Sequence, residues 1–142
     1  MKRKRLERRQ PMREILFRGK RVYNGAWLAG DLLANKYERP NICPIGDVNC
    51  YPVIPETVGQ YTGMKDKNGE KIFEGDIVKY STTCEIFTVA WHGSFAEFVI
   101  SELQKPNKAT RGSKNMYLVN RYCEVIGNKF DNPELLKGEE NE

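Results

Sequence analysis

Residues 59–80 read GQYTGMKDKNGEKIFEGDIVKY, and this stretch decides the fold of the chain. Asn68-Gly69 lies between Met64 and Ile72, and a two-residue type I′ turn there requires positive φ at both turn positions. The chain then enters Ile77–Tyr80, a run rich in residues that favour strands. The stretch predicts a small β domain built from hairpins, and by itself it indicates no biochemical activity.

The β pattern continues downstream of this stretch. Short polar turns separate three β-rich runs, which predict consecutive strands at 77–80, 85–91 and 95–100. Both faces of these strands are half apolar, as in a closing barrel whose outer face is partly covered. The second half of the chain therefore predicts a barrel that begins at about residue 53.

The upstream part predicts a hairpin followed by irregular chain. Asn24-Gly25 is a turn signal that links residues 18–23 to residues 27–33. Residues 34–52 contain prolines and a glycine at positions that forbid a long regular element. This segment is predicted to be a long loop.

The C-terminal part predicts two more strands and a helical turn. The strands are expected at 116–119 and 123–126. Asn132 is expected to cap the helical turn, with Pro133 in its first position.

The positive charge of the chain is concentrated at its beginning. The 142 residues carry a net charge of +4, whereas residues 1–11 alone carry +5, so the remainder sums to −1. The basic side chains of this extension are Lys2, Arg3, Lys4, Arg5, Arg8 and Arg9. Residues 1–11 are either an upstream extension from an alternative start, or a basic arm that contacts phosphates or acidic protein surfaces.

Three sequence blocks resemble one known family. The blocks are MREILFRGK at 12–20, the 59–80 stretch, and CEVIGNKFDNPELL at 123–136. Their order and spacing resemble the YopX family, so the likeness covers roughly residues 12–136. The resemblance implies a phage or prophage protein, a mostly β fold with an SH3-like barrel element, and no catalytic residues.

Together, pattern and resemblance predict a mainly β fold class. The expected architecture is an SH3-like barrel element with an additional N-terminal β-hairpin and a short C-terminal helical turn. The expected organisation is a basic extension at 1–11, a single YopX-like β domain at 12–136 and a charged tail at 137–142.

Residue spacing favours no metal, cofactor or catalytic site. Cys43 and Cys50 are too far apart for a usual zinc pair, and Cys84 and Cys123 stand alone. The basic start leads into no apolar segment, and no run is long enough to span a membrane. We therefore expect a protein of the host bacterial cytoplasm with four free thiols. His92, the single histidine, is expected in a solvated turn.

Short acidic residues and glycines are expected to serve turns. Asp66 and Asp76 lie beside turn signals, where carboxylates accept hydrogen bonds from nearby backbone N–H groups. The glycines of the 59–80 stretch do not match a phosphate-binding loop, because no Gly-Lys-Ser/Thr sequence and no helix follow. The chain is therefore not expected to be an enzyme.

Two aromatic residues are the candidate binding residues outside the arm. Most aromatic side chains in a β domain pack in the core, but exposed ones form grooves for peptides or bases. Trp27 and Tyr61 are the least certain to be core residues. They join the six basic residues of the arm as predicted binding residues.

The sequence leaves two classes of function open. The first is a non-enzymatic phage binding module that engages a protein or nucleic-acid partner. The alternative is an oligomeric structural or accessory phage protein, a possible homo-oligomer. Binding to nucleic acid would weaken steeply with salt, whereas self-assembly would make the measured mass depend on concentration.

Deleting residues 1–11 tests whether the arm binds nucleic acid. Each phosphate neutralised on duplex DNA contributes about −0.9 to the salt slope, so the deletion should reduce the slope by several units. Folding should be intact, because the domain begins near Met12. The measurement is binding to mixed-sequence DNA from low to moderate salt. Equal affinity and slope with and without the arm would rule out this role.

Overall fold

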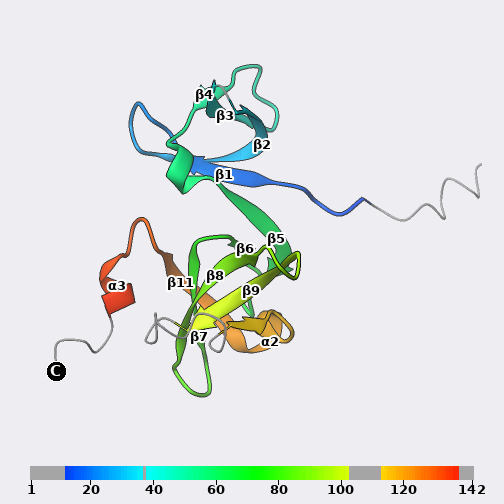
Figure 1. Ribbon diagram of the computed structural model, residues 1–142, viewed down its shortest axis with the longest axis vertical. Coiled ribbons are helices and arrows are strands. Elements are labelled where there is room, and N and C mark those ends of the chain that lie inside the picture. Colours follow the sequence, from blue (N-terminus) through cyan, green and yellow to red (C-terminus); the bar gives the residue numbers. More distant parts are fainter. Residues whose placement is uncertain (1–11, 37, 103–112, 138–142) are drawn as a thin grey trace, which may run out of the picture.

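The computed structural model describes residues 12–36, 38–102 and 113–137 (Figure 1). Its strands form two antiparallel sheets, with orders β4-β3-β2-β1-β5-β6 and β10-β9-β8-β7-β11. In chain order the elements are β1 (Phe17–Lys20), β2 (Trp27–Asn35), β3 (Glu38–Pro44), β4 (Tyr51–Pro52), η1 (Pro55–Thr57), β5 (Gly59–Lys65), β6 (Lys71–Phe73), β7 (Asp76–Tyr80), β8 (Ile86–His92), β9 (Glu97–Glu102), β10 (Ser113–Asn115), α2 (Val119–Tyr122), β11 (Cys123–Asn128) and α3 (Glu134–Lys137). The mainly β class is confirmed.

The N-terminal strands belong to the six-stranded sheet. β1 and β2 pair antiparallel, from Phe17 opposite Gly30 to Lys20 opposite Trp27. β3 and β4 lie in the 34–52 segment, so the prediction of a wholly irregular segment is wrong. Pro52 lies on the edge strand β4, a position that tolerates the missing N–H of proline. Residues 17–52 thus form four strands, where the sequence predicted a hairpin and a long loop.

β5 joins the two parts of the molecule seen in Figure 1. Its first residues pair with β1, where Gly59 lies opposite Arg18. Its later residues pair with β6, where Tyr61 lies opposite Phe73. One strand therefore continues the N-terminal sheet and also starts the C-terminal part.

The turn between β5 and β6 differs from the predicted one. Gly69 has a φ of +84°, but Asn68 is not among the residues with positive φ, so the turn is not type I′. The N–H of Gly69 donates to the Asp66 carbonyl at 3.0 Å, and the Asp66 N–H donates to the Glu70 carbonyl at 2.7 Å. This is a three-residue hairpin loop in which glycine takes the left-handed position.

The Asp66 side chain holds this turn against β11. Its Oδ1 accepts the N–H groups of Asn68 and Glu70, at 2.8 and 2.9 Å. Its Oδ2 accepts the N–H of Val125 at 2.9 Å. The predicted role of Asp66 as an acceptor for local N–H groups is confirmed, and the Val125 bond adds a long-range contact.

The five-stranded sheet carries the larger core. Strands β7, β8 and β9 follow one another as predicted, and β11 returns to pair with β7. Its buried cluster comprises Ile72, Val78, Phe87, Val89, Ile100, Met116, Val119 and Cys123. The strand order is open, so within the described ranges no pairing closes a barrel, and the expected closed SH3-like barrel is corrected. β6 pairs with β5 instead of completing a ring.

The helical segments lie late in the chain. The predicted helical turn is present as α3, which follows Pro133, and the Asn132 carbonyl accepts the N–H of Leu135 at 3.0 Å. Asn132 Oδ1 accepts the N–H of Asn128 at 3.1 Å. The strand predicted at 116–119 is wrong, because the chain turns there into α2. None of the helices in the described ranges has the length and hydropathy that crossing a membrane requires.

Two of the cysteines are paired. Cys43 and Cys50 form a disulfide with their Cα atoms 4.1 Å apart. In the register of β3 and β4, Ile42 lies opposite Tyr51, so the next pair along the ladder is Cys43 and Cys50. The expectation of four free thiols is therefore wrong for this pair. Cys84 is free and exposed, and Cys123 is free and buried.

Arg18 connects the two sheets through a buried ion pair. Its Nη2 lies 2.7 Å from Oδ1 of Asp76 on β7 and 3.3 Å from the carbonyl oxygen of Glu74. Its guanidinium carbon lies 4.7 Å from the ring centroid of Trp27 and 4.8 Å from that of Phe73. Asp76 Oδ2 accepts the N–H of Phe73 at 2.7 Å, which confirms its predicted turn role.

Burial dominates the charge state of Asp76. Desolvation raises the pKa of this carboxyl above its ordinary value, although Arg18 and the N–H of Phe73 act in the opposite direction. The Asp76 carboxylate is only 2% exposed, and removing the arginine would leave it without a counter-ion. Loss of one partner of a buried pair is far more damaging than loss of both.

Arg18→Met should therefore lower the free energy of unfolding by about 3–5 kcal/mol. Adding Asp76→Asn should recover part of this loss, because the amide is uncharged and still accepts the N–H of Phe73. Urea denaturation measures both effects, and the control is Arg39→Met, at an exposed residue of β3. Equal unfolding free energies for Arg18→Met and Arg39→Met would contradict this role.

Candidate functional site

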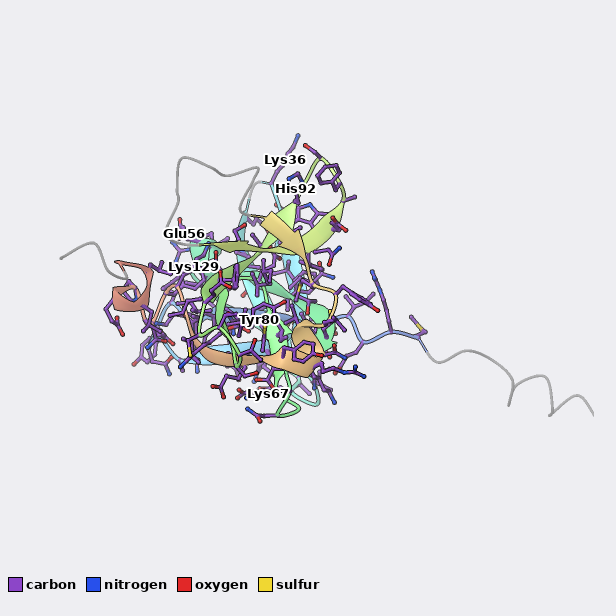
Figure 2. All side chains as sticks on the ribbon, turned by 90° about the horizontal axis from the view of Figure 1, so that it is seen from below. Lys36, Glu56, Lys67, Tyr80, His92 and Lys129 are labelled. Carbon is purple, nitrogen blue, oxygen red and sulfur yellow. A yellow bond between two sulfur atoms is a disulfide. The ribbon has the colours of Figure 1, made fainter. Side chains whose placement is uncertain are left out.

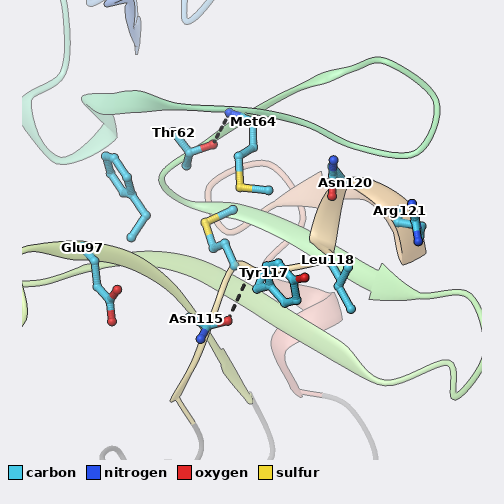
Figure 3. Close-up of a pocket in the computed structure, with 10 residues that line it drawn as sticks. Thr62, Met64, Glu97, Asn115, Tyr117, Leu118, Asn120 and Arg121 are labelled. Carbon is cyan, nitrogen blue, oxygen red and sulfur yellow. Dashed lines mark hydrogen bonds between the residues drawn. The ribbon is translucent and has the colours of Figure 1, made fainter. Parts of the chain in front are cut away.

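A groove lies between β5, β9 and the segment that enters α2. Its volume is about 630 Å³. We call it the methionine groove and define it by its lining residues, Thr62, Met64, Glu97, Phe98, Asn115, Met116, Tyr117, Leu118, Asn120 and Arg121. The volume falls in the range of small-ligand sites, and the groove is open to solvent (Figure 3).

The floor of the methionine groove is apolar. Met64 comes from β5, Phe98 from β9, and Met116 from the chain after β10. Met116 is only 6% exposed, whereas Tyr117 beside it is 76% exposed. Unbranched methionines adapt to differently shaped apolar groups, so this floor suits a side chain or ring of variable form.

A left-handed backbone position shapes one wall. Leu118 has a φ of +72° and directly precedes α2. This backbone conformation is uncommon for a residue other than glycine. The N–H groups of Arg121 and Tyr122 both donate to its carbonyl, at 3.0 and 3.1 Å, which fixes the turn. The sharp turn places Tyr117 and Leu118 before α2 and Asn120 and Arg121 within it.

Some polar side chains of the groove form hydrogen bonds within the protein, and others do not. Thr62 Oγ1 donates to the Ile72 carbonyl at 2.9 Å and accepts the N–H of Met64 at 3.1 Å. Asn115 Oδ1 accepts the N–H of Tyr117 at 3.0 Å. Within the described part of the chain, no hydrogen bond or ion pair engages the side chains of Glu97, Asn120 and Arg121.

The charged side chains lie on opposite sides of the groove. Figure 3 shows Glu97 at one side and Arg121 at the other, with Met64 between them. A second hollow of about 380 Å³ shares Met64 and Asn120 with the groove and is lined by Lys65. The carboxylate of Asp66, which also borders that hollow, is occupied by backbone N–H groups. That carboxylate keeps its negative charge, but Arg121 and Lys65 together outweigh it, so this side is the cationic end.

Trp27, one of the predicted binding residues, is half-buried against the C-terminal segment. Its Nε1 donates to Oδ2 of Asp131 at 2.6 Å, and its ring centroid lies 6.0 Å from that of Phe130. Lys20 Nζ lies 2.5 Å from Oδ1 of the same carboxylate. The structure thus places Trp27 in a contact between β2 and the chain before α3, away from the methionine groove.

Tyr61 lies outside the methionine groove. Tyr61 is 5% exposed and packs with Leu16 and Phe73 in the smaller core cluster. It borders the second hollow and is not among the residues of the methionine groove. The predicted binding residues Lys2, Arg3, Lys4, Arg5, Arg8 and Arg9 lie outside the described residues.

The remaining titratable candidates are dispersed. His92 is the last residue of β8 and is partly buried, so the expectation of a solvated turn is wrong. It stacks on Phe95 with ring centroids 4.6 Å apart, and Figure 2 places it at the opposite end of the view from Lys67. Burial raises the pKa of the Cys123 thiol to about 11. In the described ranges, no group of three or more His, Cys, Asp or Glu side chains could hold a metal ion.

The methionine groove was not predicted from the sequence, because its residues are far apart in the chain. Met64 and Met116 have no common motif, and Tyr117–Arg121 was expected to begin in a strand. The clearest local signal was the adjacent polar pair Asn120-Arg121 after an apolar run. That signal indicates a turn or cap as readily as a binding site.

The contact of Asp131 predicts a dependence of stability on pH. Hydrogen bonds from Lys20 and then Trp27 lower the pKa of Asp131 to about 2. A lowered pKa in the folded state means that the contribution is present above the unfolded value of about 3.9. It is lost as the pH falls toward about 2.

Asp131→Asn should therefore destabilise the protein at about pH 6, and the difference from the unaltered chain should shrink below about pH 4. Denaturant unfolding across this range measures the difference. The control is Asp31→Asn, an exposed carboxylate on β2. A difference that is independent of pH would contradict the assignment.

Comparisons with known proteins identify the family and the fold. A family model described as YopX protein matches residues 17–137, most of the chain. No curated protein matches. The crystal structure of protein EF1440 from Enterococcus faecalis is similar, with 22% identity and a TM-score of 0.53 over 88% of this chain and 99% of that one. This likeness shows the fold alone. The match to the family model confirms the resemblance seen in three sequence blocks, and the chain belongs to the YopX family.

Proposed function

We propose that this chain is a non-enzymatic binding module of phage or prophage origin, with the methionine groove as its binding site. The module engages a protein or nucleic-acid partner. The observation that carries the proposal is the combination of an apolar floor with unengaged polar side chains at its rim. Binding sites commonly pair apolar surface with a few polar groups that fix orientation.

The chemistry of the groove supports recognition. The carboxamide of Asn120 both donates and accepts hydrogen bonds, and the guanidinium of Arg121 donates several. Phe98 and Tyr117 offer aromatic surface, and Trp91 extends it, since its ring centroid lies 5.0 Å from that of Phe98. These groups bind and orient a partner without transferring a proton.

A second candidate function is that of an oligomeric or accessory protein. It is favoured by the loop between Cys43 and Cys50, where Ile45 is 75% exposed and Val48 is 96% exposed. Tyr51 donates its hydroxyl to Asp47 Oδ2 at 3.0 Å, so the loop is also fixed from within. A constrained loop with exposed aliphatic side chains suits contact between proteins.

We propose the bacterial cytoplasm as the location, on the strength of the resemblance to a phage and prophage family. The Cys43–Cys50 disulfide counts against it, because thiols there are mostly kept reduced.

Photo-crosslinking in cells tests the proposed function. A photoreactive benzoylphenylalanine replaces Tyr117 at the groove or, as the matched control, Tyr23 in the N-terminal sheet region. Both tyrosines are highly exposed, at 76% and 88%. Illumination should yield a discrete adduct from position 117 and none from position 23. Sensitivity of the adduct to nuclease or protease then identifies the class of partner.

Other outcomes of this experiment are equally informative. An adduct with twice the mass of the chain would support the oligomeric function instead. Equal labelling at both positions, or none at either, would contradict the groove as a binding site.

A further inference from the structure

The charges at the two ends of the methionine groove indicate what it binds. This inference rests on the proposed function and concerns the chemistry of the partner. The cationic end combines Arg121 with Lys65 in the adjoining hollow, whereas Glu97 lies at the other end. A single-stranded nucleic acid has phosphates at every step and would meet the Glu97 carboxylate unfavourably. A peptide can match charge of both signs.

The floor of the groove favours an aliphatic or aromatic side chain as the anchor. Met64 and Met116 face the groove together with Phe98, and methionine surfaces accept apolar side chains of different shape. Full burial of one such side chain contributes about 1.5–3 kcal/mol, which corresponds to roughly tenfold to hundredfold in affinity. The anchor should therefore dominate binding.

The shape of the site favours an extended segment. The groove and the hollow beside Lys65 share Met64 and Asn120 as lining residues, so the two are adjacent and together are longer than a single side chain. A chain that crosses the floor can place carboxylates near Arg121 and Lys65 and a basic residue near Glu97. The unengaged side chains of Asn120 and Arg121 then gain partners.

We propose that the methionine groove binds an extended segment of a partner protein in which an apolar anchor residue is followed or preceded by acidic residues. The anchor enters between Met64 and Met116. The acidic residues pair with Arg121 and Lys65. The partner of the module is therefore a protein, and nucleic acid does not bind in this groove.

Methyl NMR on methionine-labelled protein tests the proposal with residue resolution. The chain has four methionines, and Met12, which is 88% exposed and outside the groove, is an internal control. The probe is an acetylated and amidated peptide, Gly-Lys-Gly-X-Gly-Asp-Asp-Gly, with leucine, methionine or phenylalanine at X. It should shift the Met64 and Met116 methyl signals in a saturable manner and leave that of Met12 unchanged.

Two comparisons establish the roles of anchor and charge. Serine at X should weaken binding roughly tenfold to hundredfold. Arg121→Glu should weaken binding of the anchored peptide, whereas Arg39→Glu on β3 should not. A peptide with Asn-Asn in place of Asp-Asp should bind the unaltered chain and the Arg121→Glu variant with similar affinity.

The possible results separate this proposal from the proposed function. Absence of methyl shifts with all three anchors, or equal binding with serine at X, would overturn the peptide proposal. If a mixed-sequence single-stranded oligonucleotide shifts Met64 and Met116 instead, the peptide proposal is wrong and the binding module stands. If neither probe shifts these signals and Tyr117 yields no adduct in cells, both are wrong.

Discussion

The stack of Arg18 between two aromatic rings is the interaction on which the two-sheet arrangement depends. One guanidinium touches Trp27 of β2, Phe73 of β6 and Asp76 of β7, so three strands from both sheets converge on it. The ion pair is largely buried, with 14% of the Arg18 side chain and 2% of the Asp76 side chain exposed, and it holds the guanidinium beside both rings. The Nε of Arg18 is buried and has no hydrogen-bond partner among the described residues. An unsatisfied buried donor lowers stability, so this arrangement has an energetic cost.

This arrangement separates the structural residues from the candidate binding residues. Trp27 has its indole N–H engaged by Asp131 and its face covered by Arg18, and Tyr61 is packed in a core cluster. The unengaged polar groups instead gather at the methionine groove, where the chain turns through Leu118. The groove and the charged stack are both lined in part by the β5–β6 hairpin, so the fold that the stack stabilises also positions Met64.

Local chemistry was predictable from the sequence, whereas long-range placement was not. The strands at 77–80, 85–91 and 95–100 follow from alternation and turn residues, and Asp66 and Asp76 follow from their positions beside turns. The disulfide was missed because a search for metal-like spacing ignores antiparallel register, which places Cys43 opposite Cys50. The groove was missed because Met64 and Met116 meet only through tertiary packing, and the Leu118 turn requires a φ that no pattern in the sequence signals.

The shared strand β5 has a consequence for how this chain can change through recombination. Its first half completes the sheet of β1 and its second half pairs with β6, whose Ile72 lies fully buried in the core of the other sheet. A recombination breakpoint within residues 59–73 would join an N-terminal part and a C-terminal part from two different parent proteins. The strand pairing and core packing of one part would then not match those of the other. The chain should therefore be inherited as one indivisible unit, and variation between relatives should accumulate at turns such as 21–26 and 43–50 instead of by exchange of whole sheets.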